Sequence, residues 1–540
     1  MSSVIILNAV DYAIIGGYIL VMILVGYTLR KYMKTGEDFF LSGRSLPSWI
    51  TGLAFLSANL GALEVIGMVA NSAKYGIATV HFYWVGAIPA MVFLGLFMMP
   101  FYYGSRVRTV PEYLKLRYNE ATRGLNAISF AIMTTLMSGI SLYAMAILFE
   151  KMLGWSMHAS IIFAAAVVLL YVVWGGLSSS IYNEVIQFFL IWLGLLPVVL
   201  LGLKQVGGFA GLVAKLKEPL VHSWKYMGTS SANPLGVEWI GVVLGLGFVL
   251  SFGYWTTDFL VVQRALASKN LTAARMTPII ASFPKMLVPI IVVIPGLVAL
   301  VVLPEFAGTT GTLARYDDAL ILLMKHYLPN GLLGLAITAL LASFMSGMAG
   351  NVTAFTTVWT YDIYGSYLRR NKTDAHYVKV GKWATVVGIL ISIGTAYIVL
   401  NFNNLMDYMQ LIFSFFNAPL FATFLLGMFW RGATPWGGFW GLLIGILAAA
   451  GHYILYKAGV LHYASEMGAN FYQAWWAWLT DFVVTIGVSL ATKKKPVEEL
   501  KGLVFGLSPK TKEAVRWLKR PEVWGALAVI AALVLNFLFW

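Results

Sequence analysis

Long apolar runs recur along the whole chain, and they are the feature that most restricts how it can fold. A helical run of about 20 apolar residues crosses the roughly 30 Å hydrocarbon core of a bilayer. We therefore predict an all-α polytopic membrane protein with about 14 transmembrane helices. The predicted spans are 9–29, 49–70, 79–103, 124–150, 157–175, 182–203, 237–262, 277–303, 331–360, 382–401, 404–429, 435–457, 470–491 and 522–540.

The distribution of positive charge predicts how these spans are oriented. Of the 37 Lys and Arg residues, 27 fall in loops that share one side of the membrane in this arrangement. The positive-inside rule assigns that side to the cytoplasm, so we expect a multi-pass plasma (inner) membrane protein with both termini outside the cytoplasm. The net charge of +14 then needs no nucleic acid partner. The basic loop 492–521 is expected to meet anionic membrane lipid, a regulatory protein partner being the alternative.

The composition also limits the chemistry. The chain has no cysteine, which excludes disulfides and thiolate chemistry. No nucleophile–base set, metal-ligand motif or cofactor loop occurs among the spans, so we do not expect an enzyme or an organic cofactor.

Two predicted spans are interrupted by polar and small residues: Ser57–Glu64, with the sequence SANLGALE, and Ser251–Asp258, with the sequence SFGYWTTD. Broken helix at membrane depth is tolerated only where it lines a cavity or is buried in protein. In transporters, a matched pair of breaks indicates a substrate site near the bilayer midplane. We predict such a site here.

The span order suggests an internal repeat. The second to sixth spans (residues 49–203) and the seventh to eleventh (237–429) begin on opposite sides of the membrane, and each block starts with a broken helix. We predict two inverted five-helix repeats within a single transporter domain, residues 1–540. Residues 1–48 and 430–540 then supply peripheral helices.

The breaks contain the first candidate site residues. Asn59 offers donors and an acceptor, and Glu64 is an acid inside a span, which favours a functional role over helix packing. Tyr254 and Trp255 can stack on a ligand. For Asp258 two interpretations stay open: a ligand role, or an ion pair with Arg264.

Two other spans carry unusual polar residues. Lys285 lies within an apolar span and needs a partner, for which Glu64, Asp258 or a substrate are candidates. Ser343, Ser346 and Gly350 share one helix face. That face is suited either to close helix packing or to an alkali ion, which hydroxyl and carbonyl oxygens can hold.

Longer motifs connect these residues to a known family. They are EDFFLSGRSLPSWITGLAFLSANLGALEVIGM, RTVPEYLKLRY, YVVWGGLSSSIYNEVIQ, YWTTDFLVVQRALASKN, FPKMLVPIIVVIPG, MSGMAGNVTAFTTVWTYDIY and FLLGMFW. Together they resemble the sodium/solute symporter family, and in particular its sodium–sugar (sodium/glucose, sodium/galactose) branch. The resemblance covers nearly the whole chain. It implies the LeuT-like inverted repeat with extra helices at both ends, and sodium-driven uptake.

The resemblance also implies a sodium site. It maps the site onto carbonyl oxygens near Ser57 and Leu60 and onto Ser343 and Ser346. Glu184 matches an acid thought to assist sodium. Gly347 stands where many members have a second hydroxyl, and water, a carbonyl or Thr353 would have to replace that ligand.

The sugar pocket of the branch maps onto nine positions: Asn59, Glu64, Tyr83, Gly86, Ser251, Tyr254, Trp255, Lys285 and Gln410. Tyr254 resembles the inner aromatic gate. Three positions depart from the branch, because its pocket acid is Tyr83 here, its Asn is Ser251, and an amide or His position is Glu64.

These observations predict a sodium-coupled symporter that imports a small polar solute, in the first place a sugar or polyol, by alternating access. The alternative is a sodium- or proton-coupled symporter for a carboxylate, an amino acid or a vitamin. The expected partners are sodium, the solute and membrane lipid, and the sequence leaves the oligomeric state open.

Overall fold

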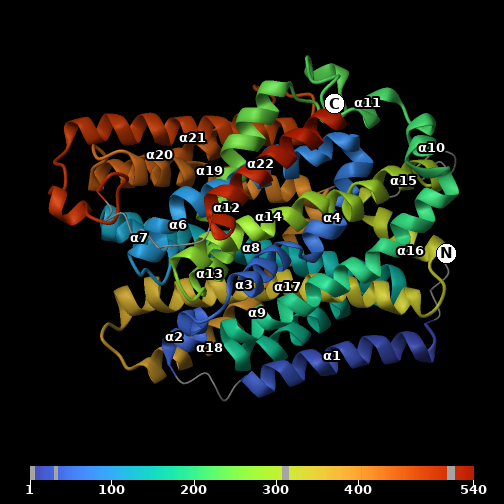
Figure 1. The fold of residues 1–540 in the computed structure, drawn as a ribbon, viewed down its shortest axis with the longest axis horizontal. Helices are drawn as coiled ribbons and strands as arrows, with labels where there is room; N and C mark the ends of the chain where they lie inside the picture. The colour runs from blue at the N-terminus through green and yellow to red at the C-terminus, as the bar shows by residue number, and fades with distance from the viewer. Residues whose placement is uncertain (1–6, 30–34, 307–314, 403, 508–516) are drawn as a thin grey trace.

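The computed structural model describes residues 7–29, 35–306, 315–402, 404–507 and 517–540. Within these residues the regular elements are helices, and one isolated bridge pairs Leu46 with Ser268. Most of the long helices lie roughly along the longest axis of the molecule and pack side by side (Figure 1). Such a bundle satisfies the backbone polar groups inside the helices, which is the condition for crossing lipid.

Eleven helical segments of the described chain are long and apolar enough to span a bilayer, and two bent helix pairs can each add one more span. The eleven are Ala9–Leu29 (α1), Phe82–Gly104, Glu120–Leu153 (α8), Gly176–Val206, Leu271–Val302, Leu332–Leu368, Asp374–Asn401, Leu405–Phe429 (α19), Pro435–Lys457 (α20), Glu466–Ala491 (α21) and Pro521–Leu538 (α22). A shorter apolar helix, Met157–Leu170, lies in the fifth predicted span. Each of the fourteen predicted runs therefore coincides with helix in the part of the chain that the structure describes.

Several spans consist of consecutive elements. They are η4 (Phe82–Ala87), α5 (Ile88–Phe93), η5 (Leu94–Met98) and α6 (Met99–Gly104); α14 (Leu271–Val292) and α15 (Ile294–Val302); α17 (Leu332–Val358) and η9 (Trp359–Leu368); and α18 (Asp374–Ala396) and η10 (Ile398–Asn401). The fifth and sixth spans together form α9 (Met157–Val206), which kinks at Gly176. The backbone there has φ 52°, and a Cβ would lie 2.6 Å from the carbonyl oxygen of Phe39, so only glycine fits.

The first break is shorter than the sequence suggested. α3 (Ser48–Asn59) and α4 (Ala62–Tyr75) are separated by two residues, and the bend of this broken span is 56°. A Cβ on Gly61 would lie 3.1 Å from Cα of Gly347 in α17, so the break packs closely against that helix. The prediction of an interruption throughout Ser57–Glu64 was wrong, since only Leu60 and Gly61 leave the helix.

The second break is confined to one residue. η7 (Gly241–Ser251) continues into α12 (Phe252–Thr257), and α13 (Phe259–Leu266) begins after Asp258, with a bend of 48° in the span. The hydroxyls of Thr256 and Thr257 each donate to a carbonyl four residues earlier, at 2.6 Å, which is compatible with continued helix. The sequence Ser251–Asp258 is therefore mostly helical, contrary to prediction.

The two broken spans are joined at the ends of α3 and α13 that lie away from the breaks. Leu46, just before α3, donates to the carbonyl of Ala267 at 3.2 Å and accepts from the amide of Lys269 at 2.9 Å. The hydroxyls of Thr51, Ser268 and Thr277 lie within 2.7 to 3.1 Å of one another, and all three residues are buried. These contacts link α3, α13 and the start of α14 as one unit.

Shorter helices connect the spans: α2 (Gly36–Leu41), α7 (Val110–Arg117), α10 (Gly208–Lys215), α11 (Glu218–Val221) and α16 (Ala319–Tyr327). The start of the predicted basic loop packs against α7 and the end of α19. Tyr113 donates to the carbonyl of Leu503 at 2.5 Å, and Phe505 donates to that of Met428 at 2.7 Å. Residues 508–516 of this loop lie outside the described residues, and its contact with lipid stays a prediction.

The first span is fastened to α17 by Asp11. This fully buried carboxylate accepts from the backbone amides of Gly331 at 2.7 Å and Gly334 at 2.8 Å, at the N-terminus of α17. We expect Asp11→Ala to lower the free energy of unfolding by about 1–2 kcal/mol, because both amides lose an acceptor and the helix dipole loses its compensating charge. Thermal unfolding in detergent measures this loss. Glu499→Ala, at a largely exposed carboxylate, is the control, and equal melting temperatures for both variants would contradict the role given to Asp11.

Candidate functional site

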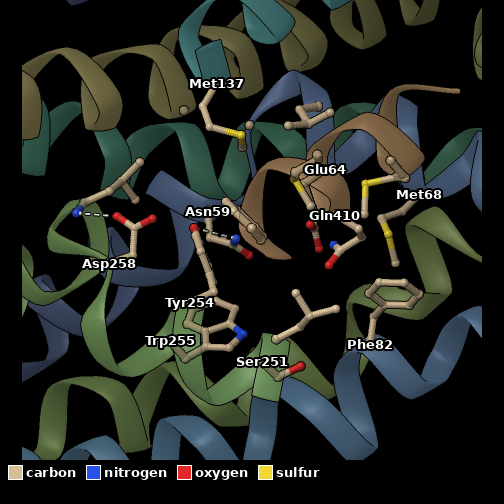
Figure 2. Close-up of a pocket in the computed structure, with 18 of the residues that line it drawn as sticks. Asn59, Glu64, Met68, Phe82, Met137, Ser251, Tyr254, Trp255, Asp258 and Gln410 are labelled. Carbon is tan, nitrogen blue, oxygen red and sulfur yellow. Dashed lines mark hydrogen bonds between the residues drawn. The ribbon is translucent and has the colours of Figure 1, made fainter. Parts of the chain in front are cut away.

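A cavity lies between the two broken helices, and helices from both halves of the chain line it (Figure 2). Its walls come from α3, α4, η4, α8, η7, α12, α13, α14, α17 and α19. Eight of the nine predicted pocket residues line it: Asn59, Glu64, Tyr83, Ser251, Tyr254, Trp255, Lys285 and Gln410. Its free volume is about 80 Å³, so this is a narrow chamber that must widen to admit a solute.

Lys285 is the central charge of the cavity wall. Its Nζ donates to Oε1 of Glu64 at 2.8 Å and to Oδ1 of Asn59. The ammonium also lies 4.9 Å from the ring centre of Tyr83 and 5.2 Å from that of Trp255. Only 2% of the lysine side chain is exposed, so this intramembrane cation is surrounded by its partners. The expected partnership with Glu64 is present, whereas Asp258 is not bonded to Lys285.

Glu64 is shared between two donors. Tyr83 donates its hydroxyl to Oε1 of Glu64 at 2.7 Å, the same oxygen that accepts from Lys285. The other oxygen, Oε2, has no hydrogen-bond partner among the described residues, and neither does the side chain of Gln410. Figure 2 shows both side chains projecting into the same part of the cavity. These two groups are available to bind a solute.

Tyr254 and Trp255 form an aromatic wall on α12. The hydroxyl of Tyr254 accepts from Nδ2 of Asn59 at 3.0 Å, and its ring stacks on Phe413 with 4.9 Å between centroids. Trp255 stacks on Phe55 at 5.6 Å. Asn59 thus connects the aromatic wall to Lys285. A movement of α12 would therefore be transmitted through Asn59 to the ion pair of Lys285 and Glu64.

Gly86 is the one predicted pocket residue that does not line the cavity. It lies directly behind Ser251, because a Cβ on Gly86 would come within 2.1 Å of the Ser251 Oγ. The absence of a side chain lets η4 and η7 approach each other closely. Gly86 therefore shapes the wall rather than presenting a group to the cavity.

A compact group of oxygen atoms lies where the first break meets α17. Ser343 donates its hydroxyl to the carbonyl of Leu60 at 2.6 Å, and the hydroxyls of Ser57 and Ser346 lie 3.1 Å apart. All four residues are fully buried. The positions expected for sodium are thus brought together, and their donor set of three hydroxyls and a carbonyl is one that suits an alkali ion.

Gly347 leaves no room for the missing hydroxyl of the family pattern. A Cβ there would lie 2.8 Å from Cα of Gly61, which is closer than real side chains come to backbone. Thr353, the suggested substitute, donates its hydroxyl to the carbonyl of Ala349 in its own helix at 2.8 Å. Any ion at this position would depend on the four residues above, on the Gly347 carbonyl, or on water.

Glu184, which the resemblance matches to an acid that assists sodium, forms an ion pair with Arg264. Its carboxylate receives two hydrogen bonds from Arg264, at 2.5 and 3.2 Å, and both side chains are completely buried. This pair fastens α13 to α9. The interpretation that Arg264 pairs with Asp258 was therefore wrong; Asp258 instead accepts from the amide of Leu260 at 2.9 Å and caps α13.

Sequence reasoning missed part of the cavity wall. Besides Asn351, the missed lining residues are mainly apolar and include Met68, Phe82, Met137, Met406, Met409 and Phe413. Three of them carried a usable signal: Met406, Met409 and Phe413 share a helical face with Gln410 at spacings of three and four. A polar residue within such a face marks the side of α19 that meets the cavity.

Comparisons with known proteins agree with this architecture. The model of the "Sodium:solute symporter family" matches residues 39–445. A sodium/glucose cotransporter from Vibrio parahaemolyticus is 29% identical over 463 residues, covering 82% of this chain and 84% of the relative. Sodium/glucose cotransporter 2 from Rattus norvegicus is 28% identical over 550 residues, covering 94% and 82%.

Solved structures show the same fold. The outward-open, substrate-bound structure of a Na⁺-coupled sialic acid symporter superposes with a TM-score of 0.76 at 20% identity, covering 90% of this chain and 99% of that one. A nucleobase-cation-symport-1 family transporter gives a TM-score of 0.51 at 12% identity, covering 86% and 97%. The predicted LeuT-like fold is thereby confirmed.

Proposed function

Because this chain belongs to the sodium:solute symporter family, and is thus a multi-pass membrane transporter rather than an enzyme, we propose that it imports a sugar or polyol together with sodium. The observation that supports the proposal is that the cavity and the cluster of oxygen atoms at Ser57, Leu60, Ser343 and Ser346 meet at one helix break. Asn59 faces the cavity, while the next residue, Leu60, supplies the carbonyl of this oxygen cluster. One short break in one helix thus belongs to both sites, which is the arrangement that coupling requires.

The cavity chemistry supports a hydroxylated solute. The relatives named as sodium/glucose cotransporters are 28–29% identical to this chain, and this chain departs from the sugar branch at Tyr83 and Glu64. These two departures compensate each other, because the Tyr83 hydroxyl touches the Glu64 carboxylate at 2.7 Å. An acid is therefore kept in the pocket, supplied by α4 instead of η4.

In the proposed transport cycle, the break between α3 and α4 is the part of the structure that moves. Sodium would bind to Ser57, Leu60, Ser343 and Ser346, joining α3 to α17 and favouring the outward-open state. Solute would then bind to Glu64, Gln410 and their neighbours, and the cavity would close around it with Tyr254 as inner gate. The membrane potential contributes about 2.3 kcal/mol per charge per 100 mV, in addition to the sodium gradient. Glu184, paired with Arg264, would act by holding α13 rather than by binding the ion.

The same proposal includes the membrane arrangement. We place the protein in the plasma (inner) membrane with both termini outside the cytoplasm, as the Lys and Arg distribution favours. Residues 49–203 and 237–429 would form the two inverted repeats, and the fold shared with the LeuT-like transporters supports this division.

Uptake by purified protein in proteoliposomes tests the proposal. A panel of labelled sugars, polyols, carboxylates, amino acids and vitamins is offered under sodium, lithium or proton gradients imposed separately. We expect a sugar or polyol to accumulate under the sodium gradient alone. Accumulation of a carboxylate, amino acid or vitamin, or a response to protons instead of sodium, would favour the alternative symporter.

A further inference from the structure

We propose that Glu64 acts as a charge filter, that is, a group that selects solutes by their charge. By pairing with Lys285, it lets the cavity accept neutral or cationic solutes and exclude anionic ones. This inference rests on the proposed symport function and adds to it a selectivity by solute charge. It concerns the position at which this chain has an acid and the sugar branch an amide or histidine.

Lys285 is not available to an anion. Its Nζ already donates to Glu64 and Asn59, and two aromatic rings, those of Tyr83 and Trp255, lie within 5.2 Å of the cation. The lysine side chain is 2% exposed, against 10% for Glu64. A solute that enters the cavity therefore meets the carboxylate more readily than the ammonium.

The polar groups of the cavity that have no hydrogen-bond partner among the described residues include Oε2 of Glu64 and the side-chain amide of Gln410. As part of a charged carboxylate, Oε2 of Glu64 accepts hydrogen bonds and cannot donate them. Next to it, Gln410 offers an amide that can both donate and accept, and Figure 2 shows both side chains directed into the cavity. This part of the cavity favours a solute with a hydroxyl or ammonium donor.

The cavity lining carries more acidic than basic side chains. The charged residues among those that line the cavity are Glu64, Asp258 and Lys285, two acids and one base. Asp258 is bonded to a backbone amide and has no cationic partner within the described residues. A carboxylate solute would have to separate Lys285 from Glu64 and leave the acid unpaired at membrane depth, which is costly.

Replacing Glu64 with glutamine should reverse this selectivity. The glutamine keeps the shape and can still accept from Tyr83 through its carbonyl oxygen, but it no longer neutralises Lys285. The ammonium then becomes the natural partner of an anionic solute. We expect kcat/KM for a carboxylate solute to rise at least about tenfold in Glu64→Gln, a change equivalent to about 1.4 kcal/mol.

The test uses sets of solutes that share a carbon skeleton and differ in charge. The hexose sets are glucose, glucuronate and glucosamine, and galactose, galacturonate and galactosamine; the three-carbon set is glycerol, glycerate and 2-aminopropane-1,3-diol. Sodium-driven uptake of each is measured for the wild-type protein, Glu64→Gln and the control Glu499→Gln, which changes an exposed carboxylate. In the wild type and the control, the neutral or amino member should exceed the carboxylate at least about tenfold, and Glu64→Gln should reverse that order.

Each outcome has a defined meaning. Preferential uptake of a carboxylate by the wild-type protein would overturn the charge filter while leaving sodium symport intact. An unchanged order in folded Glu64→Gln would also overturn it. If Glu64→Gln does not fold, the double variant Glu64→Gln/Lys285→Gln, which removes both charges of the pair, should discriminate less against carboxylates than the wild type, and unchanged discrimination would overturn the filter. Absence of sodium-driven uptake for the whole panel would refute the proposed function, and the filter with it.

Discussion

Replacing Lys285 with methionine is expected to reduce sodium-driven solute uptake at least about 100-fold. The substitution leaves the Glu64 carboxylate without its cation and Asn59 without its donor at a buried position. Removing one partner of a buried ion pair typically costs about 3–5 kcal/mol, which corresponds to a factor of about 10²–10³ or more. Initial uptake rates in proteoliposomes, normalised to the folded protein, measure the effect.

A matched control separates this effect from a general loss of lysine. Lys501→Met removes a largely exposed lysine that pairs with Glu498 in the basic loop, and we expect uptake to stay unchanged. Wild-type kcat/KM in Lys285→Met would contradict the role of Lys285 in the cavity. A variant that binds solute normally but no longer responds to sodium would contradict it as well.

The second large effect is expected at the oxygen cluster. Ser346→Ala should raise the sodium concentration for half-maximal uptake at least about tenfold, equivalent to about 1.4 kcal/mol, and uptake should recover at saturating sodium. The Ser346 hydroxyl lies 3.1 Å from that of Ser57, so its removal deletes one of the four clustered oxygens and leaves another without its partner. Ser343→Ala should act in the same direction, because Ser343 donates to the Leu60 carbonyl. Sodium titrations of the initial rate at fixed solute give the required constants.

Ser392→Ala provides the comparison for both variants. Ser392 is equally buried, but its hydroxyl donates only to the carbonyl of Gly388 in its own helix, at 2.7 Å. We expect its sodium dependence to match that of the wild-type protein. If Ser343→Ala and Ser346→Ala also titrate like the wild type, the ion does not bind at this position.

The spans were predictable from sequence because lipid imposes one dominant requirement. Apolar length fixes where helices cross, and the predicted runs all coincide with helices in the described chain. The bounds of the breaks were not predictable, since they depend on contacts between helices. Gly61 leaves the helix where it meets Gly347, 286 positions away, while Thr256 and Thr257 remain helical by bonding to their own backbone.

The sequence located the cavity residues best where the family resemblance supplied their positions. It was least successful at predicting which charged or polar side chains bond to each other. Asp258 and Arg264 are six residues apart, and the sequence left an ion pair between them open beside a ligand role for Asp258. In the folded chain Arg264 binds Glu184 of a distant helix, and Asp258 caps the helix that carries Arg264. Similarly, Tyr83 and Glu64 lie on different spans. Only the structure shows that they touch, and so that these two departures from the sugar branch compensate each other.

The central claim is that one break couples solute to sodium. The most direct test is to measure both fluxes together in proteoliposomes with equal sodium on both sides, using a solute from the panel that is transported. An inward solute gradient should then drive radioactive sodium into the vesicles against equilibrium, and Ser346→Ala should weaken this flux at low sodium. Solute entry that carries no sodium, or that carries protons in its place, would contradict the account.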